Sequence, residues 1–245
     1  MKITYIHRTL VLLLLGAALS SNAQGKDVEK VLDKATDFYK NKDQYKINMT
    51  FSLYRGLTGN TITETYKGTM EKSGEYSRNT ILSTQVHRFS KAQLVIDATA
   101  KTMTYTQIDP VAVQNSPMEI GAFLKYYEKS QLLDTGENQW ICEMVTTKKN
   151  FIQVPYSKVV LYINKKDYSI SKQELYFTNL IPFKGKSGNN TEQDYGRLVI
   201  ELKHDFDSKI QKRELKDFLT NTSGRTKQLQ KEFVSYRLID QTKDN

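Results

Sequence analysis

The chain has 245 residues, 38% of them hydrophobic, with a formal net charge of +9 and one cysteine. A single cysteine cannot close an intramolecular disulfide. Lys and Glu are interspersed along the chain rather than clustered, which is typical of a solvated surface and not of a nucleic-acid interface. We therefore expect no nucleic-acid partner, and a chain of this length favours one domain.

The N-terminus has the three parts of a cleavable signal peptide. Lys2 and Arg8 form a basic start, residues 9–19 form an apolar run, and small residues lead up to Ala23. The run is too short for the roughly 20 residues of a membrane-spanning helix. We expect cleavage after Ala23, which lowers the net charge from +9 to +7, and a periplasmic location. Gln24 rather than cysteine follows the cut, so no lipid anchor is expected.

The mature chain, residues 24–245, opens with a helical pattern and then changes period. Apolar side chains recur every three or four residues over 27–40, which predicts an amphipathic helix. From Tyr45 to Leu53 they alternate with polar ones, as in a half-buried strand. The turn-forming residues 56–60 lead into a second alternating run, 61–70. The two runs are predicted to pair as an antiparallel hairpin.

Short strand-like runs continue along the chain as a meander, in which strands that are neighbours in sequence pair in space. Residues 184–196 are rich in Gly and Asn and predict a mobile loop, while 207–231 fit helix and strand equally. The predicted strands beyond the first hairpin are 75–83, 85–90, 91–97, 102–107, 140–147, 158–164, 168–177, 197–206 and 233–240.

A second helix is predicted over residues 117–130. Ser116 is a good N-cap, Pro117 suits the first helical position, and Glu119 completes a capping box. Phe123 and Leu124 then belong to an apolar stripe.

The modest apolar content favours a single curved antiparallel sheet over a two-sheet sandwich, because one apolar face needs fewer inward side chains. Two short helices cannot fill the concave face of such a sheet, and an unfilled apolar hollow is a ligand site by default. The fold class is therefore mainly β with α, with helices covering the concave face.

The first hairpin supplies the candidate wall of this hollow. Met and aromatic side chains adapt to flexible ligands such as acyl chains, although they also pack ordinary cores, and the sequence leaves both readings open. The predicted cavity residues are Ile47, Met49, Phe51, Leu53, Ile62, Tyr66, Met70, Phe123 and Leu124.

Residues with catalytic or metal-binding chemistry are sparse. Neither His87 nor His204 has a partner at metal-ligand spacing, and no nucleophile elbow, P-loop or dinucleotide fingerprint is present. Glu64 and Glu174 come closest to isolated acids, but both have polar neighbours. Cys142 lies in an apolar run and is predicted to be a buried, inert thiol. We expect no catalytic residue, no metal site, no cofactor and no enzymatic activity.

Three stretches carry a resemblance to a known family: 28–54 with 66–70, the hairpin 94–106, and 158–177. Together they are similar to the LolA-like outer-membrane lipoprotein carriers, and 233–240 is a looser match. The resemblance implies an N-terminal helix and a meander bent into an incomplete β-barrel, with helices over the hollow. The family's Arg-Pro and Arg-Trp stretch is absent after the first hairpin, where the chain reads GTMEKSGEYSRNTIL. No functional residue is therefore carried over.

The resemblance implies a periplasmic carrier that shields acyl chains of lipoproteins or lipids on the way to the outer membrane. Its partners would be those chains and transport proteins of the inner and outer membranes, and we expect a monomer. The alternative is a non-catalytic interaction protein of the envelope on the same scaffold, with a filled concavity and an exposed apolar patch.

Overall fold

The computed structural model describes residues 27–108, 126–134, 138–185, 190–220 and 227–244. These residues contain one α-helix, 27–41, and sixteen strands. The strands are β1 (Gln44–Arg55), β2 (Ile62–Ser73), β3 (Tyr76–Ile81), β4 (Thr84–Phe89), β5 (Ala92–Asp97), β6 (Thr102–Gln107), β7 (Lys129–Asp134), β8 (Gln139–Val145), β9 (Tyr156–Asn164), β10 (Ile170–Phe177), β11 (Ile181–Lys184), β12 (Thr191–Asp194), β13 (Gly196–Asp205), β14 (Leu219–Thr220), β15 (Gln228–Leu229) and β16 (Arg237–Asp240).

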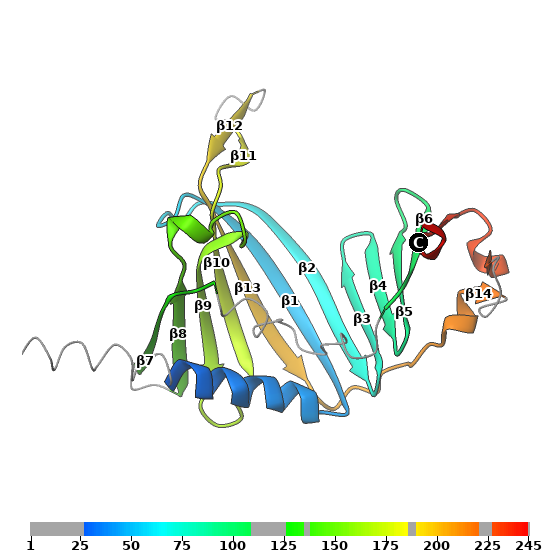
Figure 1. Cartoon of the computed structure of the whole chain (residues 1–245), viewed down its shortest axis with the longest axis horizontal. Helices are drawn as coiled ribbons and strands as arrows, with labels where there is room; N and C mark the ends of the chain where they lie inside the picture. The colour runs from blue at the N-terminus through cyan, green and yellow to red at the C-terminus, as the bar shows by residue number, and fades with distance from the viewer. Residues whose placement is uncertain (1–26, 109–125, 135–137, 186–189, 221–226, 245) are drawn as a thin grey trace, which may run out of the picture. The chain divides into compact units, whose positions relative to one another are not determined.

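Twelve of the strands form one open sheet in the order β16-β6-β5-β4-β3-β2-β1-β13-β10-β9-β8-β7 (Figure 1). The meander pairs are antiparallel, whereas β16 runs parallel to β6. Two further pairs, β11–β12 and β14–β15, are separate two-stranded sheets. The predicted mainly-β chain with a large antiparallel sheet is therefore confirmed.

The chain divides into two compact units. Of the described residues, the first contains 27–38, 55–59, 126–134, 138–185 and 190–198, and the second contains 39–54, 60–108, 199–220 and 227–244.

The first unit buries one face of the β8–β9–β10 strands. Cys142 lies opposite Leu161, and Ile163 lies opposite Ile170, and none of the four is exposed. The apolar stripe of the helix is buried too, and Lys34 Nζ donates to Tyr168 Oη at 3.1 Å in the turn between β9 and β10. The stripe consists of Val28, Val31, Leu32 and Ala35. The predicted N-terminal helix and the predicted buried thiol are both confirmed.

The predicted loop 184–196 is wrong for much of its length, because Thr191–Asp194 forms β12 against β11. Both acids of β12 bind Arg55: its Nε donates to Asp194 at 2.9 Å and its Nη2 to Glu192 at 2.6 Å. The sequence pattern did not predict this hairpin, because β12 consists of polar residues that form ion pairs and shows no alternation of apolar and polar side chains.

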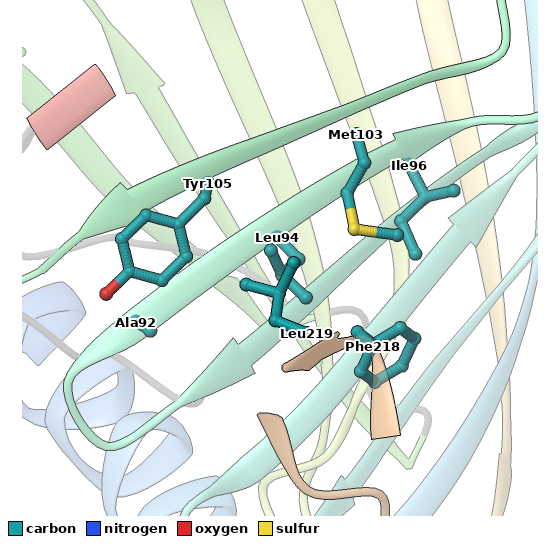
Figure 2. Packing of buried hydrophobic residues seen from close by; sticks show 7 residues of the cluster. All are labelled: Ala92, Leu94, Ile96, Met103, Tyr105, Phe218 and Leu219. Atoms are coloured by element: carbon teal, nitrogen blue, oxygen red, sulfur yellow. The ribbon is translucent and has the colours of Figure 1, made fainter. Parts of the chain in front are cut away.

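In the second unit, the C-terminal segment packs on one face of strands β4, β5 and β6 and covers it. Phe218 and Leu219 are each 1% exposed and lie against Leu94 and Met103, both fully buried (Figure 2). The described residues of the ambiguous stretch, 207–220 and 227–231, belong to this cover; they are mainly irregular, with a short 3-10 helix at Leu215–Asp217 and the strands β14 and β15. The predicted last strand, 233–240, is shorter than expected, because only Arg237–Asp240 pairs with β6.

The predicted second helix is wrong at its C-terminal end. Residues 126–128 are not helical, and Lys129 begins β7, which pairs with β8. Tertiary pairing with a neighbouring strand overrides local helical preference there. The rest of the predicted helix, including Phe123 and Leu124, lies outside the described residues, as does the predicted signal peptide. Within the described ranges, no helix has the length and apolarity to cross a membrane.

Candidate ligand-binding face

Strands β1 and β2 bring the predicted wall residues to one face of the sheet. Ile47 lies directly opposite Met70, and Phe51 lies opposite Tyr66. Because side chains alternate between faces along a strand, Met49 and Leu53 share this face, with Glu64 opposite Leu53. Ile62 lies at the end of the two strands, beyond an irregularity in their register, where it pairs with Tyr54. Directly opposed side chains lie about 5 Å apart, so the surface is continuous. We call it the β1–β2 wall: Ile47, Met49, Phe51, Leu53, Ile62, Tyr66 and Met70.

Exposure rises along the wall from one end to the other. Ile47 is fully buried and Met70 is 5% exposed, whereas Ile62, beyond an irregularity in the β1–β2 register, is 49% exposed. The four residues between these extremes, namely Met49, Phe51, Leu53 and Tyr66, are half-buried. The wall is thus sealed at one end and partly open along the rest.

The sealed end is fixed by the end of the helix. The ring of Tyr39 packs edge-on against Tyr45 with 5.7 Å between ring centres, and its hydroxyl lies 2.8 Å from His204 Nε2. Both tyrosines are fully buried. These contacts explain why Ile47 and Met70, at this end of the wall, are buried.

Lys72 is a structural residue that the sequence analysis missed. Its side chain lies on the wall face, two residues after Met70, and is 4% exposed. Its ammonium donates to the carbonyls of Tyr39, Lys40 and Lys42 at 3.0, 3.3 and 2.8 Å. Burial lowers its pKa, with the charge of Asp43 opposing the shift. A lysine here satisfies carbonyls that a helix end leaves without partners.

The buried face of the sheet changes sides between β2 and β4. Across the wall face, buried Met70 is followed by a row of half-buried residues: Asn79, Val86, Val95 and Thr104. On the opposite face, Glu71 is followed by a row that becomes apolar at Leu94. One sheet therefore offers two apolar areas on opposite faces: one under the C-terminal cover, the other forming the β1–β2 wall.

A hollow of about 660 Å³ lies behind the wall, on the polar face of the same strands. Its lining includes Asn48 and Thr69, which are cross-strand partners, together with Thr80, the partner of Thr69 on β3. Met49 is the wall residue that contributes to it. Leu82 and Leu202 also line this hollow, which shares only Met49 with the cavity residues predicted from the sequence, so the role of the wall as a ligand cavity stays a prediction.

His87 and His204 each lie within hydrogen-bond distance of a tyrosine hydroxyl. His87 is 1% exposed, with its Nδ1 3.0 Å from Tyr76 Oη and its Nε2 3.0 Å from Gln85 Oε1. Burial, reinforced by the charges of Arg78 and Arg213, lowers its pKa to about 4. Burial likewise raises the pKa of the Cys142 thiol to about 12.

Glu174 belongs to an ion-pair network of the first unit. It accepts hydrogen bonds from Tyr162 at 2.9 Å and Tyr176 at 3.0 Å, and it pairs with Lys172 at 3.0 Å. Burial alone would raise its pKa, but the bonds from Lys172 and Tyr162 outweigh burial and lower it. This carboxylate is therefore held ionised, which does not suit a general acid. In the described part of the chain, no cluster of three metal-ligating side chains is found.

The chain is distantly similar to several solved structures. A LolA superfamily protein from Nitrosomonas europaea has 13% identity and a TM-score of 0.32, covering 75% of this chain and 94% of its own. A putative outer membrane lipoprotein-sorting protein domain from Vibrio parahaemolyticus has 12% identity and a TM-score of 0.37, covering 78% and 95%. The Mycobacterium tuberculosis lipoprotein LppX has 6% identity and a TM-score of 0.39, covering 73% and 94%.

No protein-family model matches the chain, and no curated protein matches it. At these identities and TM-scores no argument about the fold or the function rests on the likeness.

Proposed function

We propose that this protein is a non-catalytic carrier that binds acyl chains of lipids or lipoproteins on the β1–β2 wall. The observation that carries the proposal is the half-exposure of apolar side chains along the wall. The other apolar area of the second unit is closed by Phe218 and Leu219. The apolar area under Phe218 and Leu219 is thus fully covered, whereas the β1–β2 wall stays partly exposed. Partial exposure suits a surface that binds a ligand.

The energetics of the wall suit a carrier that must release its cargo. Each buried CH₂ group contributes roughly 0.8 kcal/mol to binding. Side chains that are already half-buried gain only part of this contribution, and ordering a flexible chain opposes it. Met49 and Phe51 can adapt to chains of different length and branching, because thioether and aromatic groups pack against irregular apolar surfaces.

The proposal includes the place and partners of the protein. After removal of residues 1–23 it would work in the periplasm as a monomer. It would take its cargo from a transport protein of the inner membrane and deliver it towards the outer membrane. The sequence resemblance to lipoprotein carriers and the predicted signal peptide motivate this part of the proposal.

Native mass spectrometry of the protein purified from its own envelope tests the function directly. We expect a population with added mass that corresponds to a lipid or an acylated lipoprotein, and we expect a fluorescent fatty acid to displace it. Purified protein that carries no lipid and binds no fatty acid would favour the envelope interaction protein instead.

A further inference from the structure

A second hollow of the molecule lies in the second unit, on the face of the sheet opposite to the β1–β2 wall. Its volume is about 570 Å³. It is bounded by the ends of β3 to β6 and by the C-terminal segment that covers them. Its charged lining residues are four cations and two acids: Lys91, Lys212, Arg213, Lys227, Glu75 and Glu214.

Two of these cations are held by acids of the C-terminal segment. Lys227 Nζ lies 3.0 Å from Asp240 Oδ2, and the two side chains are 9% and 7% exposed. Arg213 Nη2 donates to Glu232 at 2.9 Å. Their charges are therefore neutralised within the protein, and these pairs fix the cover in place.

The other two cations have no such partner. No carboxylate in the described ranges lies within ion-pair distance of Lys91 or Lys212, and both side chains are exposed. Lys91 comes from the turn between β4 and β5, and Lys212 comes from the C-terminal segment. Two chain segments far apart in sequence thus contribute ammonium groups to the lining of one hollow. Of the lining acids, Glu214 is paired with Lys216 at 2.7 Å, which leaves Glu75 to oppose them.

Apolar and aromatic side chains complete the lining. Phe89 and Leu215 are half-buried, whereas Ala92 and Tyr105 are 3% and 6% exposed. An apolar lining with a few charged groups at defined places is the usual composition of a small-molecule site.

We propose that this hollow binds a phosphate monoester whose organic part is apolar or aromatic. A phosphate monoester carries a charge of about −1.5 to −2 at neutral pH. It therefore balances the charges of two ammonium groups better than a ligand with one carboxylate would. Lysine binds phosphate as a mobile point charge. The organic part would lie against Phe89 and Leu215. The site shares no residue with the β1–β2 wall, so it can be tested independently of the proposed carrier function.

Phenyl phosphate is the probe of choice, because it has no acyl chain to occupy the wall. Calorimetry on the mature protein should show binding tighter than that of inorganic phosphate, which lacks the ring, and of benzoate, which has one negative charge. Vesicles with and without phosphatidic acid separate the two sources of the group. Binding that requires phosphatidic acid and is lost with the lysines identifies a lipid headgroup, whereas binding of phenyl phosphate alone identifies a soluble ester. Both results support the site.

Matched variants give the proposal its sharpest test. Lys91→Gln and Lys212→Gln should each weaken phenyl phosphate binding by up to about fivefold, the upper range for an exposed ion pair. Their effects should add in the double variant if the two ammonium groups act independently. Glu75→Gln should strengthen binding. Lys209→Gln removes an exposed lysine that does not line the hollow, and it should leave the affinity unchanged. Absence of binding, or equal losses in all three single lysine variants, would overturn the proposal.

Discussion

The ring of Phe51 lies over Gly68 on the neighbouring strand, and this contact depends on the missing side chain. A Cβ placed on Gly68 would lie 3.0 Å from Phe51 Cε2 and 2.8 Å from the carbonyl oxygen of Thr80. Phe51 and the backbone of β3 thus both approach β2 at the same residue. The centre of the β1–β2 wall is shaped by this close packing.

Gly68→Ala should therefore destabilise the protein, although alanine is normally preferred over glycine inside a strand. We expect a loss of about 1–3 kcal/mol in the free energy of unfolding, which is typical of overpacking. Urea unfolding measures it. Repeating the substitution in a Phe51→Ala background separates the ring from the backbone contact, because only the ring contact is relieved there. A loss below about 0.5 kcal/mol would contradict the packing described.

Met49→Asp tests whether the wall is a ligand surface. A carboxylate at this half-buried position can stay hydrated in the empty protein, but a bound acyl chain would remove its water, which is costly for an unpaired charge. We expect little change in thermal stability and at least about a tenfold loss of fluorescent fatty acid binding.

Thr50→Asp is the matched control, because it adds the same charge one residue along the strand, on the opposite face. It should leave fatty acid binding intact. Destabilisation of Met49→Asp by several kcal/mol would show that the wall is packed core. A stable variant with normal binding would show that the ligand lies elsewhere.

The elements that the sequence predicts best are those with a clean local period. The alternation of β1 and β2 places Ile47 and Met70 on one face, and their register confirms that they are partners. The helix 27–41 likewise follows from its stripe. In both cases the side chains that define the local period are the ones that the tertiary structure buries, so local order and tertiary packing agree.

The rest depends on contacts between distant segments, which leave little local signal. Phe218 and Leu219 lie in a stretch without a clear period, and their burial comes from β5 and β6 more than one hundred residues earlier. Lys72 interrupts the apolar positions of β2, and only the position of the helix end explains it. The change of the buried face between β2 and β4 cannot be predicted from any single strand. Each strand alternates between its two faces, and the alternation alone does not say which face is covered.

Lys72→Met should weaken the attachment of the helix end to the sheet. Methionine keeps most of the length and apolar surface of the stem but leaves three carbonyl groups without their donor. Leaving buried acceptors unsatisfied costs about 1–3 kcal/mol of unfolding free energy. Chemical unfolding should report a loss in this range. Lys67→Met, at an exposed position of the same strand, should change stability by less than about 0.5 kcal/mol. Equal effects of the two variants would refute a capping role for Lys72.

His87 should make the protein less stable in acid. Its pKa is about 4 in the folded protein, compared with about 6.5 in the unfolded chain. Between these values the unfolded state binds a proton that the folded state rejects. The contribution of His87 is therefore complete above about pH 6.5, is lost as the pH falls towards 4, and stays constant below that. The loss is about 3 kcal/mol, and unfolding measured at intervals of pH should resolve it.

His87→Gln removes the titrating group and keeps polar atoms near Tyr76, so its stability should change less over the same pH range. His204→Gln serves as the control, because it leaves His87 in place and should retain the acid loss. Identical pH profiles for the wild type and His87→Gln would show that other groups govern acid stability.

Phe218→Ala and Phe51→Ala together test whether the two apolar areas of the second unit differ as described. Phe218 is 1% exposed and stacks on Phe233 with 5.6 Å between ring centres, so its truncation should leave a cavity in a closed core. The expected loss in unfolding free energy is about 3–5 kcal/mol. Phe51 is only half-buried, and its truncation should cost about 1 kcal/mol. Fatty acid binding should show the reverse order, with a clear loss for Phe51→Ala and none for Phe218→Ala at a temperature where the variant remains folded. Similar stability losses at both positions, with binding unaffected by either, would mean that both areas are ordinary core and that no open wall exists.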